Sequence, residues 1–191
     1  RRIPVSEAIS ILGAGSWGLA IANLLNNNGH KVKIWEFNRS EYEVLLKHRT
    51  HPDKLPGCKL SDNILITNDL DGCISSADII ILAIPSQNLR SALEKINIDL
   101  RKITGIVNLA KGIENGSLQR ISQVVKGVLD IPEQKIMTIS GPSHAEEVVL
   151  DMPTTVVAAG SDDSLVEQIQ QIFSNSTFRV YKSYDLIGVE L

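Results

Sequence analysis

Short apolar runs and amphipathic stretches alternate along most of this chain. The apolar runs have the length of buried strands, and the stretches between them are apolar at three- and four-residue spacing, as helices are. We expect strands at residues 8–12, 31–36, 64–67, 79–84, 103–109, 136–139, 154–159 and 178–181. The clearest helices are expected at residues 89–96, 118–129 and 164–173. This alternation predicts an α/β fold with a doubly wound, mostly parallel sheet that is covered by helices on both faces.

Two segments add detail to this outline. Residues 79–84 are apolar throughout, as expected of a central strand that is buried on both sides, and the run ends at Pro85. In a parallel sheet of this kind, ligands bind beyond the carboxyl ends of the strands, so we expect a crevice at Pro85. Residues 48–63 contain two prolines and a glycine and have no clear period. We interpret them as a long excursion within one domain.

A glycine-rich motif lies between the first strand and the first helical pattern. Residues 13–18 read Gly-Ala-Gly-Ser-Trp-Gly. Gly13 allows a tight turn, Gly15 lets the backbone approach a pyrophosphate, and Gly18 lets the helix pack closely on the strand. The free amides at the start of the helix attract phosphate. Ser16 and Trp17 lie in the same loop. The motif therefore predicts dinucleotide binding.

An acidic residue follows the motif at a suitable distance. The second strand, residues 31–36, ends in Glu36, eighteen positions after Gly18. An acid at this place accepts hydrogen bonds from the ribose hydroxyls of a dinucleotide. Strand, glycine loop, helix and acid together predict a Rossmann-like domain.

The residues that follow later strands could carry chemistry. Lys111 comes directly after the strand at 103–109, and a cation there could hold a substrate oxygen or phosphate or polarise a carbonyl. The alternative is a surface lysine paired with Glu114. After the strand at 136–139, a Gly-Pro turn presents Ser143 at the start of a helix, where it could cap the helix and face the crevice.

Two neighbouring residues are interpreted differently. His144 is adjacent to the crevice but has no partner in the sequence, and we favour a helix-start side chain that points away from the ligand. Pro85, with the two polar residues after it, is expected to form a wall against the nicotinamide ribose.

Composition excludes several classes of protein. The 191 residues carry a formal net charge of -3 with scattered basic residues, which gives no reason to expect nucleic acid as a partner. No apolar stretch approaches the roughly 20 residues that span a bilayer, so we expect no transmembrane segment and a cytoplasmic protein. Cys58 and Cys73 have no metal-ligand spacing, and we expect reduced thiols and no metal site.

The end of the chain resembles the start of a helix. Asp185 could cap a helix whose apolar pattern still runs at Leu191. We therefore expect a dinucleotide-binding domain at residues 1–184, and in residues 185–191 the beginning of a second domain that is absent from this chain.

Several motifs together resemble the NAD(P)-dependent glycerol-3-phosphate dehydrogenase family of bacterial type. The resemblance covers nearly the whole chain, and the lysine-glycine and Ser-Gly-Pro motifs are its most specific parts. It rests on residues 13–18, Trp35, Leu-Pro-Gly at 55–57, Ile-Pro-Ser at 84–86, Ala-Lys-Gly-Ile-Glu at 110–114, Ser-Gly-Pro-Ser-His-Ala at 140–145, and 178–181 leading to Ile-Gly-Val-Glu at 187–190.

The resemblance implies reduction of dihydroxyacetone phosphate to sn-glycerol 3-phosphate, which feeds phospholipid synthesis, with NAD(H) or NADP(H) as cofactor. The family's catalytic lysine belongs to a helical C-terminal domain beyond Leu191, so no catalytic acid is named here. That domain is also where we expect any homodimer contact. By the same resemblance, Ser16, Trp17, Phe37 and Ala145 touch the cofactor, Lys111 touches cofactor and substrate, and Gly141 and Ser143 touch the substrate.

One departure bears on cofactor choice. Many bacterial members have an arginine where this chain has Phe37, and an aromatic ring can stack on adenine but cannot neutralise a 2′-phosphate. Glu36 would repel that phosphate, so we expect a clear preference for NADH, although Arg39 leaves NADPH open. Two other functions remain alternatives: a stand-alone nicotinamide-binding sensor module, and a related two-domain hydroxy-acid dehydrogenase.

Overall fold

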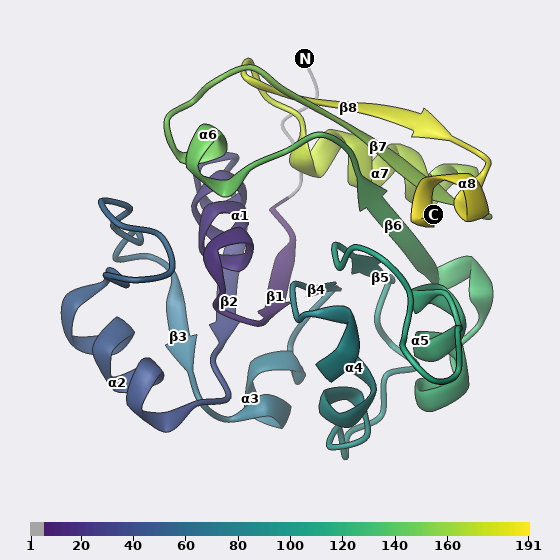
Figure 1. Ribbon diagram of the computed structural model, residues 1–191, viewed down its shortest axis with the longest axis horizontal. Helices are drawn as coiled ribbons and strands as arrows, with labels where there is room; N and C mark the ends of the chain where they lie inside the picture. Colours follow the sequence, from purple (N-terminus) through teal and green to yellow (C-terminus); the bar gives the residue numbers. More distant parts are fainter. Residues whose placement is uncertain (1–5) are drawn as a thin grey trace.

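The computed structural model describes residues 6–191, which form one eight-stranded sheet with helices on both faces (Figure 1). The strand order is β3-β2-β1-β4-β5-β6-β7-β8, and every neighbouring pair is parallel except β6 and β7. The strands are β1 (Ala8–Leu12), β2 (Lys31–Trp35), β3 (Leu65–Thr67), β4 (Ile79–Leu82), β5 (Gly105–Asn108), β6 (Ile136–Ser140), β7 (Thr154–Gly160) and β8 (Phe178–Ser183). All eight predicted strands are confirmed, as is the mostly parallel sheet.

Helices connect these strands and cover them. They are α1 (Ser16–Asn27), α2 (Arg39–His48), α3 (Leu70–Ile74), α4 (Ser86–Leu93), α5 (Ile121–Leu129), α6 (Ala145–Val149), α7 (Asp163–Phe173) and α8 (Leu186–Glu190), with a 3-10 turn at Glu133–Lys135. In the described part of the chain, no helix is long and apolar enough to cross a membrane.

The two faces of the sheet have separate cores, and β4 contributes to both. Ile79 and Ile81 pack in one cluster with the apolar residues of α1 and α7. Ile80 and Leu82 pack in the other with α3, α4 and α5. All four side chains are almost completely buried, which is why this run has no polar position. The sheet is therefore doubly wound, as predicted.

Two predicted helices have different bounds in the structure. The helix expected at 89–96 is α4, which starts three residues earlier and ends three residues earlier. The helix expected at 118–129 begins only at Ile121, because Leu118 has a φ of 56° and lies in a turn closed by the bridge between Ile113 and Arg120. A residue in the left-handed region cannot lie inside an α-helix.

The excursion at residues 48–63 folds back onto α1. Leu55 and Leu60 are buried, and the side chain of Asn23 on α1 donates to the carbonyl of Lys59 (3.0 Å) and accepts from the amide of Ser61 (3.0 Å). The excursion is thus a packed part of the domain, and its middle lies next to the glycine loop.

Candidate functional site

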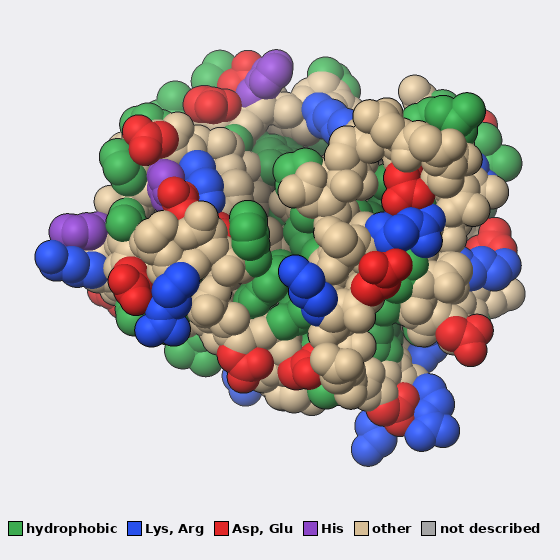
Figure 2. All heavy atoms as spheres, turned by 60° about the horizontal axis from the view of Figure 1, so that its bottom comes forward, with side chains coloured by type: hydrophobic (Ala, Val, Ile, Leu, Met, Phe, Trp, Pro, Cys, Tyr) green, Lys and Arg blue, Asp and Glu red, His purple; other side chains and the backbone are tan. Residues whose placement is uncertain are grey.

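A cavity of about 640 Å³ opens where the carboxyl ends of β1, β2, β4 and β5 meet the glycine loop. Figure 2 shows this face hollowed at its centre, with hydrophobic side chains in the hollow and charged ones around it. Among the residues proposed from sequence, those that line the cavity are Gly13, Gly15, Ser16, Trp17, Glu36, Phe37, Pro85, Lys111, Ser143 and Ala145. Gly18 and Gly141 are the two proposed residues that do not line it.

Each of the three glycines of the loop is explained by a different structural reason. Gly13 has a φ of +109°, and a Cβ atom there would lie 2.6 Å from the carbonyl oxygen of Ala83. A Cβ at Gly18 would lie 2.0 Å from the carbonyl oxygen of Gly13. A Cβ at Gly15 would meet nothing within 4 Å, although Gly15 lines the cavity. Gly13 and Gly18 are therefore required by the protein's own packing, whereas Gly15 leaves room for a ligand.

The start of α1 has the properties of a phosphate site. Its N-cap residue is Gly15, which has no side chain to satisfy the first amides, and the first turn contains no acidic residue. By contrast, α2 is capped by Asn38 and α7 by Asp162. An uncapped helix start with free N–H groups attracts an anion. These residues fit the pyrophosphate of a dinucleotide.

Glu36 and Phe37 form the end of the cavity that β2 provides. The side chain of Glu36 is only 2% exposed, accepts a hydrogen bond from the amide of Asn38 (2.9 Å), and forms an ion pair with Lys54 (3.0 Å). The Phe37 ring is 67% exposed and lies 6.3 Å from the Trp35 ring, centroid to centroid. A buried carboxylate beside an exposed ring fits a ribose and an adenine.

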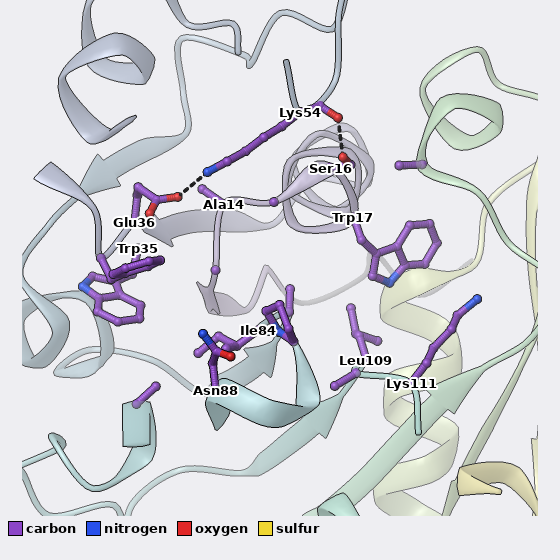
Figure 3. A pocket seen from close by; sticks show the side chains of 18 of the residues that line it. Ala14, Ser16, Trp17, Trp35, Glu36, Lys54, Ile84, Asn88, Leu109 and Lys111 are labelled. Atoms are coloured by element: carbon purple, nitrogen blue, oxygen red, sulfur yellow. Dashed lines mark hydrogen bonds and ion pairs between the residues drawn. The ribbon is translucent and has the colours of Figure 1, made fainter. Parts of the chain in front are cut away.

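Lys54 belongs to this end of the site and was not predicted from the sequence. It lies in the excursion, and in Figure 3 its side chain extends to Glu36 above the glycine loop. Its Nζ also lies 3.0 Å from the carboxylate of Glu41. Burial lowers the pKa of Lys54, but hydrogen bonds to Glu41 and Glu36 outweigh that effect and raise it above its ordinary value. The ammonium therefore remains charged.

Lys111 lies at the other end of the cavity (Figure 3). It is exposed, and its Nζ donates to the carbonyl oxygen of Gly141 (3.4 Å). The alternative pairing with Glu114 is wrong, because Glu114 forms a bidentate pair with Arg90 on α4 (2.9 and 2.8 Å). Hydrogen bonds from Arg90 and from a neighbouring serine hydroxyl lower the pKa of Glu114 to about 2. Within residues 6–191 no carboxylate pairs with Lys111.

The turn after β6 differs from the expectation at Ser143. Ser143 does not cap α6; its hydroxyl donates to the carbonyl of Gly141 (3.4 Å), and the N-cap residue is His144. His144 is exposed and also lines the cavity, and the direction of its side chain relative to a ligand stays a prediction. Ala145, the first residue of α6, is buried against the cavity wall.

A buried hydrogen-bond network lies behind Lys111. Asn108, at the end of β5, accepts from the amide of Ala110 (2.9 Å) and donates to the hydroxyl of Thr138 (3.3 Å). That hydroxyl donates to the carboxylate of Glu190 on α8 (3.3 Å). Glu190 also pairs with Arg120 (2.6 Å) and accepts from the amide and hydroxyl of a serine at the start of α5. The network links α8 to the loop that carries Lys111.

The remaining sequence expectations concern cysteines and metals. Cys58 and Cys73 are both free and buried. Burial raises the pKa of Cys73 to about 11. No group of three or more metal-ligating side chains occurs in residues 6–191.

Comparisons with known proteins bear on the family of this chain. The model of the family described as "NAD-dependent glycerol-3-phosphate dehydrogenase N-terminus" matches residues 8–166. A glycerol-3-phosphate dehydrogenase [NAD(P)+] of Agathobacter rectalis is 45% identical over 183 residues, which are 96% of this chain and 54% of that protein. The chain thus spans about half the length of the curated relatives it matches.

Solved structures give the same answer. A glycerol-3-phosphate dehydrogenase from Coxiella burnetii superimposes with a TM-score of 0.88 at 29% identity, covering 97% of this chain and 56% of that one. The Plasmodium falciparum enzyme gives a TM-score of 0.87 at 25% identity, covering 97% and 54%. With a matching family model, a 45% identical relative and the expected glycine loop, the chain belongs to the NAD(P)-dependent glycerol-3-phosphate dehydrogenase family.

Proposed function

We propose that the protein interconverts dihydroxyacetone phosphate and sn-glycerol 3-phosphate with NAD(P)H and so supplies glycerol 3-phosphate for phospholipid synthesis. One observation carries the proposal: a single cavity joins a phosphate-binding helix start with open space at Gly15 to the exposed cation Lys111. The names of the relatives support the same reaction.

The residues of the cavity divide the work of cofactor binding. The first amides of α1 hold the pyrophosphate, and Glu36 accepts from a ribose hydroxyl. The exposed Phe37 ring provides a surface for adenine. Pro85, at the start of α4, forms the wall between this part of the site and Lys111.

The chemistry takes place at the Lys111 end. The cofactor supplies a hydride for the central carbonyl of the substrate. Lys111 holds the anionic substrate and opposes the negative charge that develops on the reacting oxygen, because its ammonium is exposed and bound only weakly by the Gly141 carbonyl. Ser143, beside it, offers a hydroxyl to the substrate.

The proposal also covers the proton donor and the second domain. It includes the cellular compartment as well. We place the catalytic lysine and a helical substrate domain beyond Leu191, so that residues 1–184 bind the cofactor and residues 185–191 begin the next domain. A site completed by two domains closes on its substrate. Any homodimer contact lies in that second domain, and the protein works in the cytoplasm.

The test compares the 191-residue chain with the full-length gene product. NADH binding is titrated by fluorescence, and NADH oxidation is followed with dihydroxyacetone phosphate. We expect both proteins to bind NADH and only the longer one to oxidise NADH with dihydroxyacetone phosphate. Turnover by the short chain would disprove the missing proton donor, and NADH binding by both with no turnover would favour the sensor module or another hydroxy-acid substrate.

A further inference from the structure

Lys54 is a charged group in the cavity to which the proposed reaction gives no task. Its side chain is 28% exposed and reaches the site from the excursion, far from the other lining residues in sequence (Figure 3). Its Nζ lies 3.0 Å from an oxygen of Glu36 and 3.0 Å from an oxygen of Glu41. The ammonium of Lys54 thus forms ion pairs with two carboxylates.

The backbone of Lys54 is held independently of this ammonium. Its carbonyl accepts a hydrogen bond from the hydroxyl of Ser16 in the glycine loop, and its amide donates to Nδ1 of His51 (3.1 Å). The His51 ring is buried and contacts Glu41 through its other nitrogen. Since the main chain is anchored at both groups, the long side chain can change partners without moving the excursion.

The position of the ammonium matters because of what Glu36 contacts. A carboxylate at the end of the second strand of such a domain faces the ribose hydroxyls of the adenosine. NADH and NADPH differ only in the phosphate on the 2′-oxygen of that ribose. The group that decides between them must therefore lie within reach of Glu36, and Lys54 is the cation that Glu36 contacts.

We propose that Lys54 determines cofactor specificity by exchanging partners between Glu36 and a 2′-phosphate. This inference rests on the proposed function. With NADH, Glu36 accepts from the ribose hydroxyl and Lys54 stays between Glu36 and Glu41. With NADPH, the ammonium leaves Glu36 and pairs with the phosphate, so the protein uses both cofactors instead of strongly preferring NADH.

Charge explains why both residues are needed. Without Lys54, the carboxylate of Glu36 would face a phosphate dianion without the ammonium that now pairs with it. Without the charge of Glu36, Lys54 would keep only its ion pair with Glu41 and could turn to the phosphate more readily. Specificity is therefore a balance between two side chains that touch each other, and each can be changed alone.

The experiment measures dissociation constants for NADH and NADPH by fluorescence titration of the full-length protein. Lys54→Met removes the charge, Lys54→Arg keeps it, and Glu36→Gln removes the competing carboxylate. Lys59→Met is the matched control, because Lys59 is exposed in the same excursion and does not line the cavity. Adenosine 2′,5′-bisphosphate and 5′-AMP, which differ in the 2′-phosphate alone, are titrated by calorimetry as a second readout.

We expect Lys54→Met to raise the dissociation constants for NADPH and the bisphosphate about tenfold or more, because one charge-assisted hydrogen bond is lost. The dissociation constants for NADH and 5′-AMP should change less than threefold. Lys54→Arg should keep the affinity for NADPH, and Glu36→Gln should increase it. Lys59→Met should leave the affinity for both cofactors unchanged.

An equal loss of affinity for both cofactors in Lys54→Met, or no loss of affinity for either, would overturn the role of Lys54. Failure of the unmodified protein to bind NADH would overturn the proposed function itself, so the two failures are distinguishable.

Discussion

We predict that glycine is needed at position 15 for cofactor binding but not for folding. Its backbone has φ −73° and ψ 177°, which alanine adopts freely, and an added Cβ would meet no atom within 4 Å. In Gly15→Ala, the weaker N-cap costs about 0.5–1 kcal/mol, and the less flexible unfolded chain offsets a similar amount. The free energy of unfolding should therefore change by less than about 1 kcal/mol.

Cofactor affinity should respond quite differently to this substitution. The new methyl group lies on the open side of a residue that lines the cavity, where the backbone must approach the pyrophosphate. Losing one hydrogen bond to a charged group costs about 1.5–3 kcal/mol, which is about a ten- to hundredfold rise in the dissociation constant for NADH.

Gly18→Ala is the matched comparison in the same loop. Its Cβ would lie 2.0 Å from the carbonyl oxygen of Gly13 and 3.1 Å from the carbonyl carbon, both backbone atoms that cannot rotate away. Such overpacking costs about 1–3 kcal/mol, so the fold itself should weaken. Urea unfolding and NADH titration of the two variants are the assay. Normal NADH binding by Gly15→Ala, or full stability of Gly18→Ala, would refute the reasoning.

Three further predictions concern stability and reactivity. Glu190→Ala removes a carboxylate that is 2% exposed and leaves Arg120 unpaired, so urea unfolding should show a loss of about 3–5 kcal/mol, and less for Glu190→Gln. The pKa of Glu114 is lowered to about 2 by its hydrogen bonds from Arg90, so its contribution to stability is present above its unfolded value of 4.5 and is lost as the pH falls toward 2. Thermal unfolding between pH 5 and 2 should be less acid-sensitive in Glu114→Gln, and an unchanged profile would contradict this. Cys73, fully buried with its pKa raised to about 11, should react with an aromatic disulfide reagent only in urea; rapid labelling of the native protein would contradict its burial.

Much of the fold could be predicted because its signals are local. Most strands are apolar or alternating runs between polar turns, and β4 is apolar at every position because both faces of the sheet are covered. Asp185 was predicted to cap a helix, and its side chain does accept from the amide of Gly188 (2.8 Å). The glycine loop was equally clear, since the spacing of its glycines reflects contacts within a few residues and with one neighbouring strand.

Features that distant residues decide could not be predicted in the same way. The antiparallel pairing of β6 with β7 has no local signal, because an apolar run such as 154–160 does not show its direction in the sheet. The pairing of Glu114 with Lys111 stood as an alternative because the two are three positions apart, whereas the actual partner, Arg90, lies on α4. Lys54 was missed because nothing in an excursion without a period shows which side chain it will turn toward the cavity.

The two ends of the site therefore differ from the glycine loop in how they respond to change. In the proposed function the loop binds phosphate with its backbone, so only substitutions that alter its path or fill its open side should affect that binding. The charged ends depend on contacts across long stretches of chain: the Ser16 hydroxyl holds the carbonyl of Lys54 over 38 positions, and Lys111 reaches Gly141 over 30. Substitutions of Lys54 should consequently alter the choice between NADH and NADPH while phosphate binding at α1 is preserved. Cofactor preference can then change in this fold without any change in the motif by which the fold is recognised.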